Sequence, residues 1–204
     1  MNFLAHLLLS YPDEDEMTGN FMGDFVKGKS YLNYPVPIRN GILIHRAIDD
    51  FTDQNRIARR LVVALRPVYK RYAGVVSDIV FDHILARDFK NWSGTDIDSF
   101  ARYSYKALAD RRDILPERVS FILDRIRESR RLEMYASLEG IKNSVQIMSD
   151  RTSLPDHTRE LMIFMEKQSA FITKTFEEFY PELILRVKQK RQELQLHKSG
   201  KNRE

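Results

Sequence analysis

The stretch Gly41-Ile-Leu-Ile-His45-Arg-Ala-Ile-Asp49-Asp-Phe-Thr-Asp53 decides the fold class. Its apolar residues recur at intervals of three and four positions, which is the period of a helix rather than the alternation of a strand. At 100° per residue, His45, Asp49, Thr52 and Asp53 fall within an arc of about 100°. We therefore expect a helix with an imidazole and carboxylates on one face. Such residues share a cation or form an ordinary ion pair on the helix surface.

The same spacing continues through the chain of 204 residues, in which Gly and Pro number only 8 and 7. Strand patterns are almost absent, and no repeat or Gly/Ser/Pro-rich stretch divides the sequence. The pattern predicts an all-α, single-domain helical bundle over residues 1–195 and a basic, disordered tail over residues 196–204. The expected helices cover about 2–10, 17–28, 37–54, 56–72, 74–91, 96–112, 117–138, 140–150, 156–178 and 180–197.

The composition limits the chemistry open to the protein. Because there are 0 cysteines, disulfides, thiolate nucleophiles, Cys-ligated zinc and iron–sulfur clusters are excluded, and any metal must be held by His, Asp and Glu. Lys and Arg total 33 against 29 acidic residues, which gives a net charge of +4 and a pI near 9.2. This modest excess of positive charge favours an anionic partner.

The N-terminal sequence MNFLAHLLLSYPDEDE is apolar at first. It lacks the basic leading region and the small-residue cleavage site of a secretory signal, so we expect it to form the first helix. No run approaches the roughly 20 apolar residues that span a bilayer. These features predict a cytoplasmic protein without a membrane partner, and the sequence carries no signal for an oligomeric state.

The helix expected at 74–91 contains Asp82 and His83 in a segment that is apolar nearly all round. A buried carboxylate is costly unless it is paired or binds a metal. Asp82 therefore needs a partner, which is either a metal ion or a core arginine such as Arg46. Because consecutive helical residues diverge by about 100°, Asp82 and His83 border one site only if it lies between their directions.

Two further segments carry polar residues in apolar surroundings. His6 lies in the first expected helix, as a metal ligand or as a hydrogen-bonded core histidine. In the second expected helix, Asn20 and Asp24 are spaced to share a face. Gly23 lies between them, and because glycine inside a helix costs about 1 kcal/mol, we expect a packing or site reason for it.

Together these segments supply imidazoles and carboxylates from four helices. Without cysteine, such a donor set suits Mn²⁺, Fe²⁺ or a mixed-ligand Zn²⁺ site, and Mg²⁺ if the carboxylates dominate. The residues therefore favour one metal site near the N-terminal half of the chain.

The sequence resembles the acyl carrier protein phosphodiesterase family, whose members remove the 4′-phosphopantetheine arm of the carrier protein. The matching pieces in the N-terminal half are Met1-Asn-Phe-Leu-Ala-His6, Gly19-Asn20…Asp24-Phe-Val-Lys-Gly28, Gly41-Ile…His45-Arg46…Ile48-Asp49…Thr52-Asp53 and Asp82-His83…Leu85. Weaker matches follow at Tyr135, Gly140-Ile141, Met148-Ser-Asp-Arg151 and Phe176-Glu-Glu-Phe179-Tyr180-Pro181. All run in the same order over nearly the whole chain.

The resemblance implies a fold like that of the HD phosphohydrolases and a reaction that cleaves the phosphodiester between phosphopantetheine and a carrier-protein serine. It implies a divalent metal, with Mn²⁺ preferred and Mg²⁺ or Fe²⁺ as alternatives. We expect one or two divalent cations to be held by Asp24, His45, Asp49, Asp82 and His83, with His6 as a further ligand. The implied catalytic residues are Asp24, His45, Asp82, His83 and Arg46, the last of these as a phosphate-binding guanidinium or as an ordinary salt-bridge partner. The order Asp82-His83 reverses the usual HD order.

The helix expected at 56–72 carries six basic residues and no acid. Acyl carrier proteins are strongly acidic, so this face is either a surface that steers them or a solvated face without a partner.

Two other functions are compatible with parts of this sequence. An HD-like phosphohydrolase of a nucleotide or other small phosphodiester would need much the same site. A basic helical adaptor or nucleic-acid-binding protein would not need this site. Since no nucleic-acid-binding motif is present, we do not expect a nucleic-acid partner.

Overall fold

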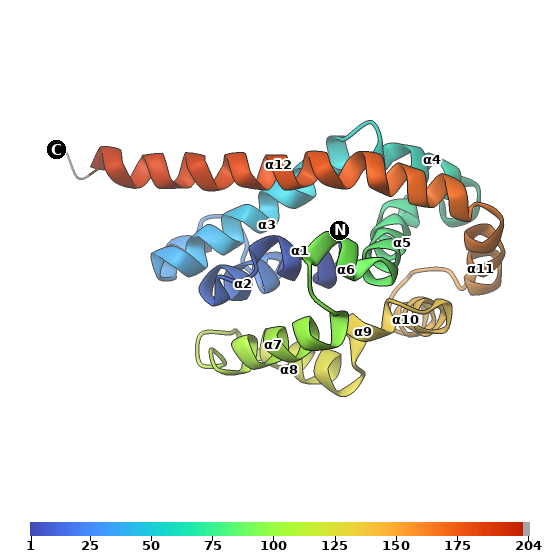
Figure 1. Cartoon of the computed structure of the whole chain (residues 1–204). Coiled ribbons are helices and arrows are strands. Elements are labelled where there is room, and N and C mark those ends of the chain that lie inside the picture. Colours follow the sequence, from blue (N-terminus) through green and yellow to red (C-terminus); the bar gives the residue numbers. More distant parts are fainter. Residues whose placement is uncertain (202–204) are drawn as a thin grey trace.

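The computed structural model describes the backbone of residues 1–201 and the side chains of residues 1–196 (Figure 1). The described backbone contains helices and no strand, which confirms the all-α fold class. The elements are α1 (Phe3–Ser10), α2 (Glu14–Phe21), the 3-10 turns η1 (Gly23–Phe25) and η2 (Ser30–Asn33), α3 (Val36–Gln54), α4 (Ala58–Tyr69), η3 (Lys70–Tyr72), α5 (Ala73–Arg87), α6 (Phe89–Ser93), α7 (Ile97–Ala109), α8 (Glu117–Glu128), α9 (Arg131–Met134), α10 (Leu138–Arg151), α11 (Thr158–Lys167) and α12 (Ser169–Lys201).

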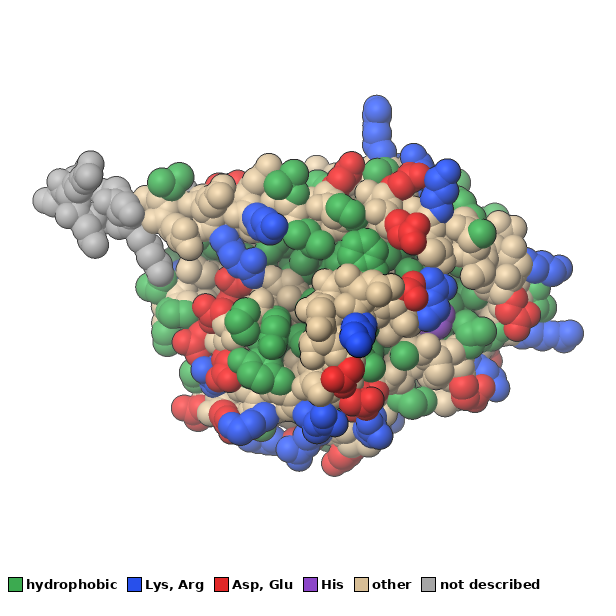
Figure 2. Space-filling model, in the orientation of Figure 1, with side chains coloured by type: hydrophobic (Ala, Val, Ile, Leu, Met, Phe, Trp, Pro, Cys, Tyr) green, Lys and Arg blue, Asp and Glu red, His purple; other side chains and the backbone are tan. Residues whose placement is uncertain are grey.

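The core surrounds α1 and α5, which lie at the centre of the molecule between α12 and the α7–α8 pair (Figure 1). α5 is buried on all sides from Ile79 to Ala86, as its sequence predicts, which is apolar apart from Asp82 and His83. Basic and acidic side chains alternate along the edge of the molecule where α7 and α8 lie (Figure 2). Among the described residues, no helix combines the length and the apolar character needed to cross a bilayer.

α2 and α3 pack closely where two glycines face each other. A Cβ on Gly19 would lie 2.0 Å from the Ile38 carbonyl oxygen, and one on Gly41 would lie 2.2 Å from the Glu16 carbonyl oxygen. Neither position therefore accepts a side chain without a shift of the backbone. This close crossing holds the turn after α2 against the middle of α3, where His45 lies.

Several element bounds differ from those expected. α2 ends at Phe21 and a 3-10 turn follows, so Asn20 and Asp24 do not share one continuous helical face. The helix expected at 117–138 breaks at Arg130, which has a φ of 48°. The break expected between 178 and 180 instead falls at Gln168.

The C-terminal helix also differs from the expected tail. α12 is helical as far as Lys201, past residue 196 where we expected the basic tail to begin. The disorder of that tail stays a prediction. The remaining residues of that expected tail, 202–204, lie outside the described part of the chain.

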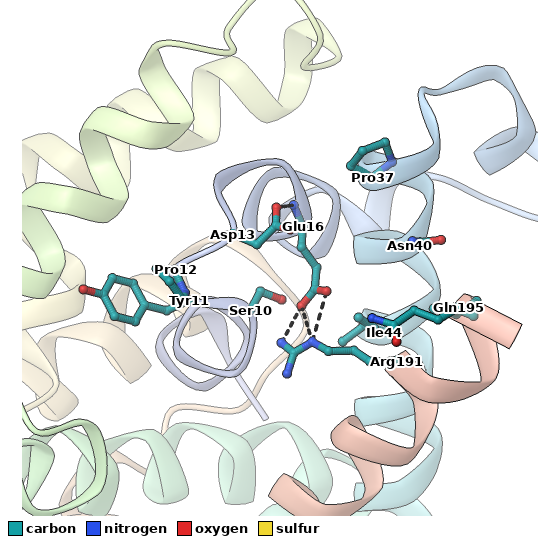
Figure 3. A pocket seen from close by; sticks show the side chains of 11 residues that line it. Ser10, Tyr11, Pro12, Asp13, Glu16, Pro37, Asn40, Ile44, Arg191 and Gln195 are labelled. Carbon is teal, nitrogen blue, oxygen red and sulfur yellow. Dashed lines mark hydrogen bonds and ion pairs between the residues drawn. The ribbon is translucent and has the colours of Figure 1, made fainter. Parts of the chain in front are cut away.

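α12 is fastened to the first two helices by Arg191 (Figure 3). Its guanidinium hydrogen-bonds the Glu16 carboxylate, with Nε 3.0 Å from Oε1, and also donates to the Leu9 carbonyl oxygen. Arg191 and Glu16 line a cavity of about 390 Å³, together with Ser10 and Ile44. The C-terminal part of the chain therefore covers the helices that carry the N-terminal polar residues.

Candidate metal centre

His6 of α1 meets His45 and Asp49 of α3, which are about 40 positions away in the sequence. Nε2 of His6 lies 3.1 Å from Oδ1 of Asp49, and Nε2 of His45 lies 3.1 Å from Oδ2 of the same carboxylate. The two imidazole rings lie 4.3 Å apart between centroids. Ligand atoms of all three residues fit within 4.8 Å of one another. Asp24 joins them from η1, with Oδ1 3.4 Å from Nε2 of His45.

The buried ring of His45 shows that this donor set fits a cation. Both of its nitrogens are buried without a hydrogen-bond partner among the described residues, although two carboxylates lie within 3.4 Å of Nε2. The atoms are close but not aligned for hydrogen bonds, as expected for donors that converge on a common ion rather than on each other. Two imidazole nitrogens and a carboxylate are donors that Mn²⁺, Fe²⁺ and Zn²⁺ accept.

The charges of the cluster are strongly coupled. Burial opposes a charge on His45, but the nearby carboxylates of Asp24 and Asp49 outweigh it and raise the pKa of His45 to about 9. Burial also raises the pKa of Asp49, yet His45 and His6 together bring it well below its usual range. Burial lowers the pKa of His6, which keeps its ring neutral. The two carboxylates therefore hold a positive charge between them, which a metal ion can supply in place of a proton.

A hydrogen-bond chain orients His6. Nδ2 of Asn20 donates to the His6 carbonyl oxygen at 2.9 Å and to Oγ of Ser10 at 2.8 Å. This leaves Oδ1 of Asn20 facing Nδ1 of His6 at 2.7 Å. Nδ1 must then carry the proton, and Nε2 keeps its lone pair toward Asp49. Asn20 was expected near Asp24; its role behind His6 depends on how α1 and α2 pack, which helix periodicity does not reveal.

Local backbone geometry places His45. The α3 residues His45 and Asp49 are one turn apart, as expected from their spacing. A Cβ on Gly23 would lie 2.3 Å from Cγ of His45, so only glycine lets η1 pack against this ring. The expectation that Gly23 has a packing reason is confirmed, and the turn it permits carries Asp24 to the cluster.

The cluster opens on its carboxylate side. The side chains of Asp24 and Asp49 are 64% and 39% exposed, whereas those of the two histidines are at most 7% exposed. Arg46 lies beside this opening, where Nη2 donates to the Val26 carbonyl oxygen at 2.8 Å and the guanidinium stacks over Tyr31. Arg46 thus holds the segment that follows Asp24, and it forms no pair with Asp82.

The sequence matches a known protein family over most of the chain, including the residues that build this cluster. Residues 1–183 match the family model described as acyl carrier protein phosphodiesterase. The chain belongs to the acyl carrier protein phosphodiesterase family. The matched segment includes all four residues of the cluster and ends within α12, before Arg191.

Individual phosphodiesterases of this family align with nearly the whole chain. The acyl carrier protein phosphodiesterase of Enterobacter sp. (strain 638) is 29% identical over 191 residues, which cover 93% of this chain and 99% of that protein. The acyl carrier protein phosphodiesterases of Salmonella paratyphi A and Salmonella agona are 29% and 28% identical, again over 93% of this chain and 99% of each relative. No solved structure matches the chain. The expected likeness to the HD phosphohydrolase fold therefore stays a prediction.

Asp82 makes contacts outside the cluster. It is fully buried in α5 and accepts from the backbone amides of Asn2 at 3.2 Å and Leu4 at 3.0 Å. These amides belong to the start of α1, the helix that carries His6 one turn later. Burial raises the pKa of Asp82 to about 7, although the N-terminal ammonium and these two amides favour its charged form. The partner that this carboxylate requires is the end of a helix rather than an arginine.

His83, its neighbour in the sequence, points elsewhere. Nδ1 of His83 donates to the Tyr135 carbonyl oxygen at 2.8 Å. The ring lines a separate cavity of about 410 Å³, together with Arg87 and Glu166. The structure thus brings His6, Asp24, His45 and Asp49 together, sets Arg46 at the edge of their opening, and places Asp82 and His83 apart from them.

Proposed function

We propose that the protein hydrolyses the phosphodiester that joins 4′-phosphopantetheine to a serine of holo acyl carrier protein, and that the reaction requires a divalent cation. The observation that carries this proposal is the buried Nε2 of His45, which lies within 3.4 Å of two carboxylates without a hydrogen bond among the described residues. Membership of the acyl carrier protein phosphodiesterase family supports the choice of substrate over a nucleotide or another small phosphodiester.

In this proposal four residues hold the cation. His6 and His45 would each provide Nε2, Asp49 would provide a carboxylate oxygen, and Asp24 would provide an oxygen from the exposed side. We propose Mn²⁺ as the preferred ion, with Mg²⁺ or Fe²⁺ as alternatives. A divalent ion bound here would lower the pKa of a coordinated water and neutralise charge on the phosphodiester.

The chain's own groups prepare the site in three ways. Asn20 keeps the proton of His6 on Nδ1, so that Nε2 remains a donor of electrons. The buried histidines exclude water from one side, while the exposed carboxylates leave the other side open to the prosthetic arm. Asp82 orients the first turn of α1 and therefore the position of His6. No protein nucleophile is required, because the attacking group is water.

The test is the mass of the carrier protein. Incubation of holo acyl carrier protein with the purified protein and Mn²⁺ should convert it to the apo form, which intact-mass spectrometry detects as loss of the prosthetic group. Asp24→Ala and His45→Ala should each lower the rate at least about a hundredfold while circular dichroism remains helical. Asp50→Ala is the matched control, because this exposed carboxylate lies on the far side of α3.

Three results would contradict the proposal. The carrier protein could keep its mass with every divalent ion tried. The reaction could proceed unchanged in excess chelator, which would remove the metal requirement. Alternatively, the fully metallated Asp24→Ala protein could turn over normally, which would remove that residue from the site.

A further inference from the structure

The opening of the metal cluster is bordered by a segment without negative charge. From residue 25 to residue 48 the chain contains no acidic residue, and its basic residues are Lys27, Lys29, Arg39 and Arg46. Lys27 and Lys29 are exposed and follow Asp24 by three and five positions. An anionic macromolecule that delivers its prosthetic arm to Asp24 would therefore meet positive charge at the rim.

α8 extends this basic rim. The guanidinium of Arg118, in the first turn of α8, stacks over the ring of Phe25 with its Cζ 5.7 Å from the centroid. Phe25 directly follows Asp24 in η1. The contact therefore joins α8 to η1, the turn that carries the exposed Asp24, although the two segments are about 90 positions apart in the sequence.

Three residues form a continuous strip along α8. At 100° per residue, Arg118, Phe121 and Arg125 fall within an arc of about 60°, and no acidic residue of α8 falls inside that arc. Phe121 is 60% exposed, and Cζ of Arg125 lies 5.7 Å above its ring. We call Arg118, Phe121 and Arg125 the α8 strip.

The arginines of the α8 strip differ from their neighbours in having no carboxylate partner within the described part of the chain. Arg112 instead binds Asp124 with two hydrogen bonds of 2.7 and 2.6 Å, and Arg130 lies 2.7 Å from Asp98. Unpaired arginines around an exposed aromatic ring are the composition of a protein–protein contact centre, where Arg and aromatic residues contribute most of the binding free energy.

The positive surface continues past the strip. Arg125 lines a cavity of about 210 Å³ together with Arg131, Arg151 and the apolar side chain of Phe3. None of the described residues that line this cavity is acidic. The α8 strip therefore lies between two positively charged regions, the rim of the metal cluster and this cavity.

The basic face of α4 is less well placed. Arg60 of α4 and Arg56, two residues before this helix, line a cavity with Ala47, Asp50 and Gln54 of α3. At 100° per residue, these three α3 residues lie about 140–200° around the helix from His45, which is the face opposite the metal cluster. Arg60 is also paired with Glu178 of α12. A carrier protein bound at α4 would thus approach the wrong side of α3.

We propose that the α8 strip, with the loop that carries Lys27 and Lys29, is the surface on which the acidic carrier protein docks. This inference rests on the proposed function, because the substrate of that reaction is the occupant. The carrier protein's acidic surface would contact Arg118 and Arg125, and Phe121 would pack against its apolar residues. The prosthetic arm would then cross Phe25 to reach Asp24.

The test compares two pairs of charge reversals that change the net charge equally. Arg118→Glu with Arg125→Glu alters the α8 strip, and Arg59→Glu with Arg66→Glu alters exposed positions on α4. Steady-state hydrolysis of holo acyl carrier protein should show kcat/KM reduced about tenfold or more in the α8 variant at low salt, with kcat within about twofold. The kcat/KM of the α4 variant should stay within about twofold of the parent value. Added salt should narrow the difference in kcat/KM between the parent and the α8 variant.

Two further measurements separate docking from chemistry. Hydrolysis of bis-p-nitrophenyl phosphate, which needs no docking surface, should be equal in the parent and both variants. Titration of the metal-free protein with apo acyl carrier protein, followed by calorimetry, should show binding that the α8 variant and Phe121→Ala weaken. If the parent binds the carrier protein but never hydrolyses it, the proposed function fails and the docking surface stands.

Either of two outcomes overturns the docking surface itself. One is a parent-like kcat/KM and carrier affinity in the α8 variant. The other is an equal or larger loss in the α4 variant, which would place the carrier protein on α4.

Discussion

Asn20 shows how one buried amide can govern the candidate metal centre without touching the metal. Its Nδ2 donates to His6 and Ser10, so its Oδ1 accepts from the His6 ring. Groups that orient a metal-binding histidine in this way usually change metal affinity about 10–100-fold when they are removed. Asn20 is fully buried, so its hydrogen bonds do not compete with bulk water.

We expect Asn20→Leu to weaken Mn²⁺ binding about 10–100-fold, as measured by titration followed by electron paramagnetic resonance, because His6 loses the partner that keeps Nε2 unprotonated. Thr18→Val is the matched control. Thr18 is equally buried on α2, but its hydroxyl donates only to the Glu14 carbonyl oxygen. Equal Mn²⁺ affinity in the two variants would show that Asn20 does not orient His6.

A second residue-scale prediction concerns Gly23. Gly23→Ala should weaken Mn²⁺ binding at least about tenfold and lower the melting temperature, because the added Cβ overlaps the His45 ring and forces it or η1 to move. Gly74→Ala provides the comparison, since a Cβ there meets nothing within 4 Å and alanine is the better helix former. Unchanged metal binding in Gly23→Ala would mean that the site tolerates the shift.

At the residue scale, sequence could predict His45 and Asp49 together because their pairing depends only on helix periodicity. The addition of His6 required the packing of α1 against α3, which the sequence suggested only through the apolar surroundings of this histidine. The apolar surroundings of Asp82 likewise predicted that its carboxylate needs a partner. That partner is the N-terminal turn of α1, and no local pattern marks a backbone amide as a partner.

At the scale of elements, Asp82 couples α5 to the start of α1, and this coupling predicts a pH dependence of stability. An aspartate in the unfolded chain has a pKa near 3.9, whereas burial raises the pKa of Asp82 to about 7 in the folded protein. Between these values the folded state holds a proton that the unfolded state has lost. The contribution of Asp82 to stability is therefore fully present below about pH 3.9 and is lost as the pH rises to about 7, by at most about 1.4 kcal/mol per unit.

Asp82→Asn should remove this contribution. In metal-free protein, the free energy of unfolding in urea should fall more steeply for the parent than for the variant as the pH rises from 5 to 7. The variant therefore gains relative to the parent at higher pH, whatever the cost of the substitution at pH 5. Parallel pH profiles would indicate that Asp82 has an ordinary pKa in the folded state.

The elements differ in how well sequence predicts them. α3 runs from Val36 to Gln54, close to the expected 37–54, because its period is regular and Pro37 lies in its first turn. The second helix was expected to reach residue 28 but ends at Phe21, since Gly23 must place its backbone against His45. Tertiary contact decides such an end, and a single helix period cannot show it.

At the scale of the whole molecule, α12 connects the C-terminal part of the chain to the helices that carry the metal cluster. The Glu16 carboxylate is buried at 7% exposure and pairs with Arg191, which is 175 positions away. Periodicity predicts that a helix exists here, but it contains no information about which distant residue the helix will contact. The long-range contacts of this fold could therefore not be predicted from the sequence, whereas its all-helical class could.

Arg191→Ala should destabilise the protein by about 1–3 kcal/mol in urea unfolding, because the buried Glu16 carboxylate and the Leu9 carbonyl oxygen both lose their donor. Arg186→Ala is the control on the same helix. It removes a surface pair with Glu193 that contributes at most about 1 kcal/mol. Combining Arg191→Ala with Glu16→Gln should recover part of the loss, since the second change removes the unpaired charge. If Arg191→Ala is no more destabilising than Arg186→Ala, the C-terminal helix is held by its apolar face alone, and the contact between the two ends of the chain adds nothing to stability.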